Sequence, residues 1–278
     1  MITKIRVKAL YSLPKSEHTG EDNDDFILTG ASGNEYAVSD GATVSIFSRE
    51  WARVLCEHFC ASPVNRITPE WIASASEKLD DMVQGTSMNR FAELNFKEQG
   101  SHATLLGLRF DFEEKKFFVT SIGDTCIYFR NSALGKMLPL DRPEMFNNYP
   151  HFLCSITDKN MESLANQINY SGRLLEGKNR FYVMTDALAK WFARNLARER
   201  ESRKKPNEVK RENSLKESLY KPLKLTRSLF EGNEPWKRLD RILNEGSFGR
   251  FVRNLRRKNQ IDDDDTSLLI LEVLVGDK

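Results

Sequence analysis

The sequence predicts a layered fold of mixed α and β structure, and three observations support this prediction. Short apolar runs bounded by turn residues, typical of buried strands, fall into two groups along the chain. Two groups of segments with helical spacing of apolar residues accompany them. The chain has 278 residues, of which 40% are apolar and 17 are Phe, so it can bury a sizeable core. Sheets and helices that each have one apolar face pack as layers.

The first group contains three predicted strands and two predicted helices. The strands are residues 2–10, 26–29 and 35–39, and the glycine-rich stretch between the last two is typical of a tight hairpin. The first helix is expected to be capped by Ser48 and to carry Trp51 and Phe59 on its apolar face. Thr68-Pro69 is a typical start for the second helix, with Thr at the cap and Pro at the first helical position.

The second group begins with predicted strands at 102–110, 116–122 and 126–130, where residues 112–115 form a hairpin turn. Residues 131–179 show no consistent pattern. A strand at 180–185 leads into a helix that carries Leu188, Trp191, Phe192 and Leu196. A last helix around 236–258 and a final strand at 267–275 complete the chain.

Composition excludes several classes of protein. The 42 basic and 40 acidic residues nearly cancel, so the net charge indicates no particular partner. The four cysteines form no Cys-x-x-Cys pair, and Cys56 and Cys60 are expected to be small apolar core residues. The first residues alternate like a strand and lack the apolar centre of a signal peptide, and no apolar run is long enough to span a membrane. We therefore expect a cytoplasmic protein without a membrane partner.

One segment, at about 194–229, departs from this pattern because basic residues dominate it and large apolar side chains are few. Its first interpretation is an exposed helix followed by a mobile loop, inserted into a single domain of residues 1–278. Its second is a basic patch that recruits an acidic partner or a nucleic acid. Nucleic acid is the less favoured partner, because the segment has few aromatic side chains on which bases could stack.

Four acidic turns, each at the end of a predicted strand, carry most of the functional information. They are Asp40-Gly41, Asp124, Asp186 and the run 262–265. Carboxylates gathered from distant segments at one sheet edge would repel one another unless a cation lay between them. Mg²⁺ and Mn²⁺ prefer oxygen ligands of this kind. The arrangement therefore predicts a hard-metal site, although each acid taken alone is equally typical of a turn, a helix cap or a solvated loop.

The order of these motifs resembles that of the PPM (type-2C) metal-dependent serine/threonine protein phosphatases, in particular a bacterial branch of that family. The resemblance runs from about residue 18 to 275 and depends on short motifs. These are Asp22-Asn23-Asp24, Ser39-Asp40-Gly41, Ser101-His102-Ala103-Thr104, Gly123-Asp124-Thr125, Thr185-Asp186-Ala187 and Asp264-Asp265-Thr266-Ser267.

The resemblance implies an α+β fold, a four-layer α-β-β-α sandwich of two mainly antiparallel sheets flanked by helices. It also implies a dinuclear Mn²⁺ or Mg²⁺ centre. By analogy, Asp40 bridges the two ions and the Gly41 carbonyl binds one of them. Asp186 and Asp264 complete the ligands of the other ion. Asp24 orients water on the metals, and Asp124 serves a third, weaker ion together with Asp186.

The sequence departs from the family pattern in the early motif and in the third turn. Many members carry an Arg that holds the substrate phosphate at the position of Thr19, and we consider the neighbouring His18 as its substitute. Asn23 stands where some members have Glu, and Ala187 stands where most have Gly. The register of the early motif also allows Asp22 or Asp25 in the role assigned to Asp24.

The resemblance implies hydrolysis of phosphoserine and phosphothreonine in proteins by metal-activated water. The expected partners are phosphorylated proteins and a cognate Ser/Thr kinase. The sequence has no Gly-x-x-x-x-Gly-Lys-Ser/Thr loop, which argues against an NTPase. One alternative is a catalytically weak or inactive relative that binds a partner or a phosphopeptide. A second is a binding protein organised around the basic segment 194–229.

Overall fold

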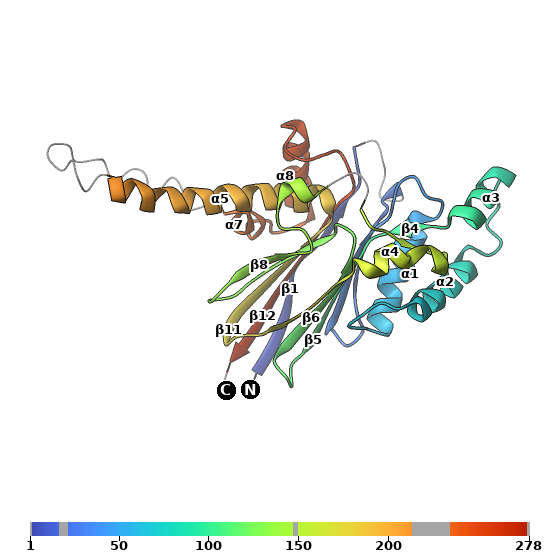
Figure 1. The fold of residues 1–278 in the computed structure, drawn as a ribbon, viewed down its shortest axis with the longest axis horizontal. Helices are drawn as coiled ribbons and strands as arrows, with labels where there is room; N and C mark the ends of the chain where they lie inside the picture. Colours follow the sequence, from blue (N-terminus) through green and yellow to red (C-terminus); the bar gives the residue numbers. More distant parts are fainter. Residues whose placement is uncertain (1, 17–21, 147–149, 213–233, 277–278) are drawn as a thin grey trace.

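Two antiparallel five-stranded sheets pack face to face and carry helices on their outer faces (Figure 1). The computed structural model describes residues 2–16, 22–146, 150–212 and 234–276. Within these residues, one sheet has the strand order β1-β12-β11-β7-β8 and the other has the order β10-β6-β5-β3-β2. The predicted α+β sandwich with four layers is confirmed.

The first half of the chain contains β1 (Ile2–Leu13), β2 (Asp25–Thr29), β3 (Glu35–Asp40), α1 (Ser48–Ala61), α2 (Pro69–Val83), α3 (Arg90–Gln99), β4 (His102–Ala103), β5 (Leu105–Asp111), β6 (Lys116–Ile122) and β7 (Cys126–Arg130). The second half contains β8 (Gly135–Leu138), β9 (Leu153–Cys154), α4 (Met161–Ala165), β10 (Ile168–Arg173), β11 (Gly177–Met184), α5 (Asp186–Glu212), α7 (Pro235–Leu239), α8 (Glu245–Arg257) and β12 (Thr266–Gly276). Short 3-10 helices lie at Pro143–Met145 and Thr157–Asn160.

Three apolar cores separate the four layers. The core between the two sheets contains alternate residues of both, among them Phe117, Phe181 and Leu271. A second core joins α1 and α2 to the β10-β6-β5-β3-β2 sheet and contains Trp51. The third joins α5, α7 and α8 to the other sheet. The central strands of each sheet therefore bury both faces, which explains why β5, β11 and β12 read as nearly continuous apolar runs.

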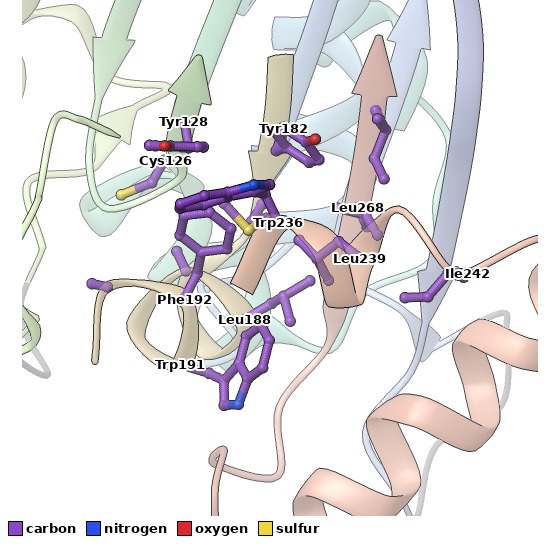
Figure 2. Packing of buried hydrophobic residues seen from close by; sticks show 14 of the residues in the cluster. Cys126, Tyr128, Tyr182, Leu188, Trp191, Phe192, Trp236, Leu239, Ile242 and Leu268 are labelled. Atoms are coloured by element: carbon purple, nitrogen blue, oxygen red, sulfur yellow. The ribbon is translucent and has the colours of Figure 1, made fainter. Parts of the chain in front are cut away.

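Trp236 is a buried member of the third core, drawn in Figure 2 among side chains of the sheet and of α5. Its ring stacks on that of Tyr128, with centroids 5.6 Å apart, and Tyr128 also contacts Phe192 of α5 at 4.9 Å. Leu188 and Trp191 of α5 lie on the same side of the sheet (Figure 2). The apolar face predicted for the helix after residue 185 is thus the face that packs on the sheet.

The single helix predicted at 236–258 is wrong, because the structure has two helices, α7 and α8, in this region. Asp240 ends α7 and accepts hydrogen bonds from Arg180 and from the hydroxyl of Tyr182 (2.9 Å) on β11. Asn244 then starts α8 with a reciprocal capping box with Ser247. The bonds of Asp240 attach the end of α7 to β11, and the capping box starts a new helix, so a helical pattern in sequence is divided in the fold.

Two further predictions need correction. Ser48 is not the cap of α1, because the left-handed Phe47 precedes the helix and the Ser48 hydroxyl donates to Asp24 Oδ1 at 3.0 Å. The strand expected at 102–110 is interrupted at Thr104, whose amide donates to the Asp40 carbonyl at 2.8 Å. α3 has no counterpart among the predicted elements, and it buries no residue. Its pattern was weak because it lacks an apolar face that packs on a sheet.

The predicted basic segment at 194–229 coincides in part with α5, which extends away from the sheets to residue 212 (Figure 1). Residues 213–233 lie outside the described residues. No helix in the described ranges is both long and apolar enough to cross a membrane.

The contact between α1 and its sheet yields a stability prediction. A Cβ on Gly107 of β5 would lie 2.3 Å from ring carbons of the buried Phe59. We expect Gly107→Ala to lower the free energy of unfolding by about 1–3 kcal/mol, because the ring or the helix must shift. Gly276→Ala is the control, since a Cβ there meets no atom within 4 Å. Urea unfolding of both variants measures the difference, and equal stability would contradict close packing at Gly107.

Candidate metal centre

Six acidic residues come together where the two sheets end at the same edge of the sandwich. Asp25 starts β2 and Asp40 ends β3, and these two residues are directly opposite in the antiparallel pair. The other four are Asp124 between β6 and β7, Asp186 directly after β11, and Asp264 and Asp265 before β12. Both sheets thus contribute carboxylates to one cluster, which we call the acidic cluster.

Asp40 is the centre of this cluster. Burial raises the pKa of its carboxyl well above the ordinary value, and the charges of Asp25, Asp186, Asp124 and Asp264 raise it further. The backbone around Asp40 is fixed, because its amide donates to Thr104 Oγ1 at 3.0 Å and Thr104 Oγ1 also contacts Thr125 Oγ1 at 2.7 Å. Asp40 is therefore a rigidly placed carboxylate that is costly to ionise without a cation nearby.

Asp25, not Asp24, faces the acidic cluster. Burial raises the pKa of Asp25 well above its ordinary value, and the charges of Asp265 and Asp186 add to the shift. Thr185 Oγ1 donates to Asp25 Oδ2 at 3.0 Å, while Asp25 Oδ1 is buried without a hydrogen-bond partner. The side chain of Asp24 accepts a hydrogen bond from the hydroxyl of Ser48 at the start of α1.

The remaining acids share the same environment. Burial raises the pKa of Asp124 to about 6 and, with the charges of Asp124 and Asp264, raises that of Asp186 to about 8. Burial also raises the pKa of Asp264. Asp186 and Asp264 each accept a backbone N–H bond from the following residue. The pKa values of Asp124, Asp186 and Asp264 are therefore higher than that of a free carboxyl, which indicates that this part of the cluster favours either protons or cations.

Gly41 follows Asp40 at a point where a side chain has no room. A Cβ on Gly41 would lie 2.8 Å from the backbone carbonyl atoms of Ser48, at the start of α1. The Gly41 amide donates to the Asp24 carbonyl at 3.2 Å, which fixes the turn against the start of β2. Glycine at this position thus lets α1 approach the acidic cluster closely.

Two basic side chains lie beside the cluster. Lys15 Nζ donates to Thr43 Oγ1 at 3.2 Å, and the charge of Lys15 lowers the pKa of Asp264, against the larger effect of burial. Asp265 holds the Lys15 backbone, because its Oδ1 accepts the Lys15 amide at 2.8 Å. Arg256 of α8 donates to the Asp264 carbonyl and to the Pro14 carbonyl.

These residues have the donor chemistry of an Mg²⁺ or Mn²⁺ site. All candidate side-chain ligands are carboxylates, and the buried Asp25 Oδ1 has an unused acceptor. Within the described ranges, however, no three His, Cys, Asp or Glu side chains form a ready-made ligand set. Asp186 and Asp264 instead each accept a hydrogen bond from the backbone amide of the following residue.

Comparison with known proteins identifies the family. The family profile described as "Protein phosphatase 2C" matches residues 14–224, which is more than half of the chain. The chain belongs to the protein phosphatase 2C family. A search of curated proteins by sequence finds no match.

Solved structures of this family show the same fold at low sequence identity. The catalytic domain of the serine/threonine phosphatase PstP, determined with two manganese ions, is 12% identical with a TM-score of 0.53, covering 99% of this chain and 100% of its own. The Mycobacterium tuberculosis phosphatase PstP/Ppp is 11% identical with a TM-score of 0.51, at 99% and 100% coverage. The photosystem II phosphatase PBCP is 12% identical with a TM-score of 0.50, at 99% coverage of both chains.

The structure places the predicted site residues as follows. Asp40, Asp124, Asp186 and Asp264 belong to the acidic cluster, Gly41 adjoins it, and Asp24 contacts Gly41 through its carbonyl and Ser48 through its side chain. His18 and Thr19 lie outside the described residues. Sequence reasoning gave no role to Lys15 and no separate role to Asp265.

A signal for Asp25 was nevertheless present in the sequence. Asp25 directly precedes the apolar run Phe26-Ile27-Leu28, as the other acids directly follow or precede theirs. For Lys15 no local signal exists, because its position depends on the pairing of Leu13 with Thr266 at the ends of β1 and β12.

The raised pKa values predict how pH affects the stability of the metal-free protein. A carboxyl whose pKa is higher in the folded state stabilises the fold fully below its unfolded pKa, near 4, and this contribution is lost as pH rises through the folded pKa. With folded pKa values of about 6 for Asp124 and about 8 for Asp186, the loss should occur between about pH 4 and 8.

Urea unfolding in EDTA from pH 5 to 8.5 measures this loss, and added Mn²⁺ should reduce it at the upper end of the range. Asp186→Asn should flatten the pH dependence relative to Asp158→Asn, which changes an exposed carboxylate elsewhere. Identical profiles for the two variants would contradict the electrostatic origin assigned to Asp186.

Proposed function

We propose that this protein is a metal-dependent serine/threonine protein phosphatase that hydrolyses phosphoserine and phosphothreonine in proteins. The observation that carries the proposal is the buried acidic cluster centred on Asp40, in a chain of the protein phosphatase 2C family. Several buried carboxylates that raise one another's pKa are characteristic of functional sites. The proposed partners are phosphorylated proteins of the cytoplasm and the kinase that modifies them.

In this proposal Asp40, the Gly41 carbonyl, Asp186 and Asp264 would hold two divalent ions, and Asp124 with Asp186 would hold a third, weaker ion. When bound, the divalent ions activate water for attack on phosphorus and neutralise charge on the phosphoryl group. Asp25 takes the role of orienting water near the ions in place of Asp24, because its free Oδ1 belongs to the cluster.

Lys15 is our candidate for holding the substrate phosphate, in addition to His18. Its ammonium lies beside Thr43, three residues after Asp40, and close enough to Asp264 to lower the pKa of that carboxyl. Asp265 fixes the Lys15 backbone, so the ammonium has a defined position next to the cluster. A lysine at such a point attracts a phosphate dianion as a point charge.

Hydrolysis of p-nitrophenyl phosphate by the purified protein tests the proposed activity. Wild type should be active with Mn²⁺ or Mg²⁺ and inactive in EDTA. Asp40→Asn should lower kcat by more than about a hundredfold, since removing groups that merely support metal ligands already costs about 10–100-fold. Asp158→Asn is the matched control. Full activity of Asp40→Asn with metal present would refute the assignment of the site.

The same assay distinguishes the two adjacent aspartates. Asp25→Asn should lower kcat by about 10–100-fold, because its carboxylate faces the cluster. Asp24→Asn should have the smaller effect, since its side chain bonds to Ser48. A larger loss of kcat in Asp24→Asn than in Asp25→Asn would assign the role of orienting water to Asp24 instead.

A third set of variants tests Lys15. Lys15→Gln should raise KM by about tenfold, because a hydrogen bond to a charged group contributes about 1.5–3 kcal/mol, and Lys15→Arg should restore part of the affinity. Lys97→Gln, on exposed α3, is the control. An unchanged KM for Lys15→Gln would leave His18 as the remaining candidate.

The second candidate function is a non-catalytic relative that binds phosphopeptides or a protein partner. One observation favours it, namely that the sequence has Thr19 where many family members carry the Arg that holds the substrate phosphate. Isothermal titration with Mn²⁺ separates the two functions. Binding that Asp40→Asn abolishes supports the phosphatase, whereas no binding supports the alternative.

A further inference from the structure

A basic pocket adjoins the acidic cluster on the side of α8. Its volume is about 430 Å³, and it is open to solvent. The lining residues are Ser16, Arg253, Arg256, Arg257, Asn259 and Asp263. They come from the end of α8, from the turn that follows it, and from the segment after β1.

The pocket and the acidic cluster share one stretch of backbone. Asp263 lines the pocket and the next residue, Asp264, belongs to the cluster, so their Cα atoms are about 3.8 Å apart. Arg256 belongs to both regions, because it lines the pocket and donates hydrogen bonds to the Asp264 carbonyl and to Thr266 Oγ1. A molecule in the pocket therefore lies directly beside a residue held by the cluster.

Asp263, the one acidic side chain among the described lining residues, is already paired. Asp263 Oδ1 accepts from the Ser16 amide at 3.1 Å and from the Ser16 hydroxyl at 2.9 Å, and it lies 3.2 Å from Arg256 Nε. Arg256 is in turn committed to the Pro14 and Asp264 carbonyls. This pair accounts for the structural role of Asp263 and Arg256.

The other two arginines have no such role. Arg253 and Arg257 are exposed, and neither pairs with a carboxylate among the residues that the structure describes. Arg257 donates to the amide oxygen of Asn254 at 2.9 Å, one turn earlier on α8. With Arg256 neutralised by Asp263, the two guanidinium groups leave the pocket with a net charge of +2 (three arginines against one aspartate).

The chemistry of the pocket favours a carboxylate over a polyanion. Guanidinium groups bind carboxylates in bidentate fashion, and two of them suit one or two acidic side chains. None of the lining residues that the structure describes is aromatic, so they offer no ring for a base to stack on.

We propose that this pocket binds an acidic residue of the substrate, close in sequence to the phosphorylated side chain. The protein then selects phosphoserine and phosphothreonine sites flanked by Asp or Glu. This inference rests on the proposed phosphatase function, since it assigns a substrate preference to the same site.

Two phosphothreonine peptides that differ only in flanking Asp or Asn residues test the proposal. Wild type should show a higher kcat/KM for the acidic peptide. The double variant Arg253→Gln/Arg257→Gln should lower the ratio of acidic to neutral kcat/KM by about fivefold, the size expected for two exposed ion pairs. Arg250→Gln, an exposed arginine of the same helix outside the pocket, should keep the wild-type ratio.

An equal ratio in the double variant and in Arg250→Gln would overturn the pocket assignment. If wild type hydrolyses neither peptide nor p-nitrophenyl phosphate, the proposed function fails, and fluorescence anisotropy of the labelled acidic peptide still tests the pocket. Binding lost in the double variant alone would support it, and equal binding by all variants would overturn it. Displacement of the peptide by a short single-stranded oligonucleotide that binds more tightly would also overturn it, in favour of nucleic acid.

Discussion

Burial of several carboxylates at one edge of a sandwich is the constraint on which the rest of this structure depends. Asp25 and Asp40 are opposite each other on paired strands, where like charges are destabilising. Asp186 and Asp264 add charge from the other sheet. The three apolar cores must offset this repulsion in the absence of a cation, because they provide the main favourable term for folding.

The local irregularities of the chain concentrate at this edge for the same reason. The strand after α3 is interrupted at Thr104, whose backbone and hydroxyl bond to Asp40. Gly123, with φ of +99°, turns the chain before Asp124, and Gly41 leaves room for the start of α1. Such departures from regular strand pairing change the direction of side chains, so they shape the acidic cluster rather than the two sheets.

The basic side chains beside the acidic cluster fall into two groups with different roles. Arg256 bonds to backbone carbonyls and to Asp263, and it thereby holds the loop that carries Asp264. Lys15, Arg253 and Arg257 are more accessible and are not committed to carboxylates of the described chain. Under the proposed function and substrate preference, the substrate is a strongly anionic phosphorylated peptide, and these basic groups would increase its encounter rate and fix its orientation.

The sequence by itself determined the layered fold class, most of the strands and the positions of the acidic residues along the chain. Apolar runs and the turn residues beside them are local properties, so the strands, the Thr68-Pro69 helix start and the layered class were predictable from them. The tertiary structure alone decided which of the adjacent Asp24 and Asp25 turns to the cluster, because strand alternation sends neighbours to opposite sides and the register of β2 on β3 selects one. It also decided the placement of Lys15 and the division of α7 from α8. Both depend on partners, Asp265 and Arg180, that are far away in sequence and become neighbours only when the sheets have formed.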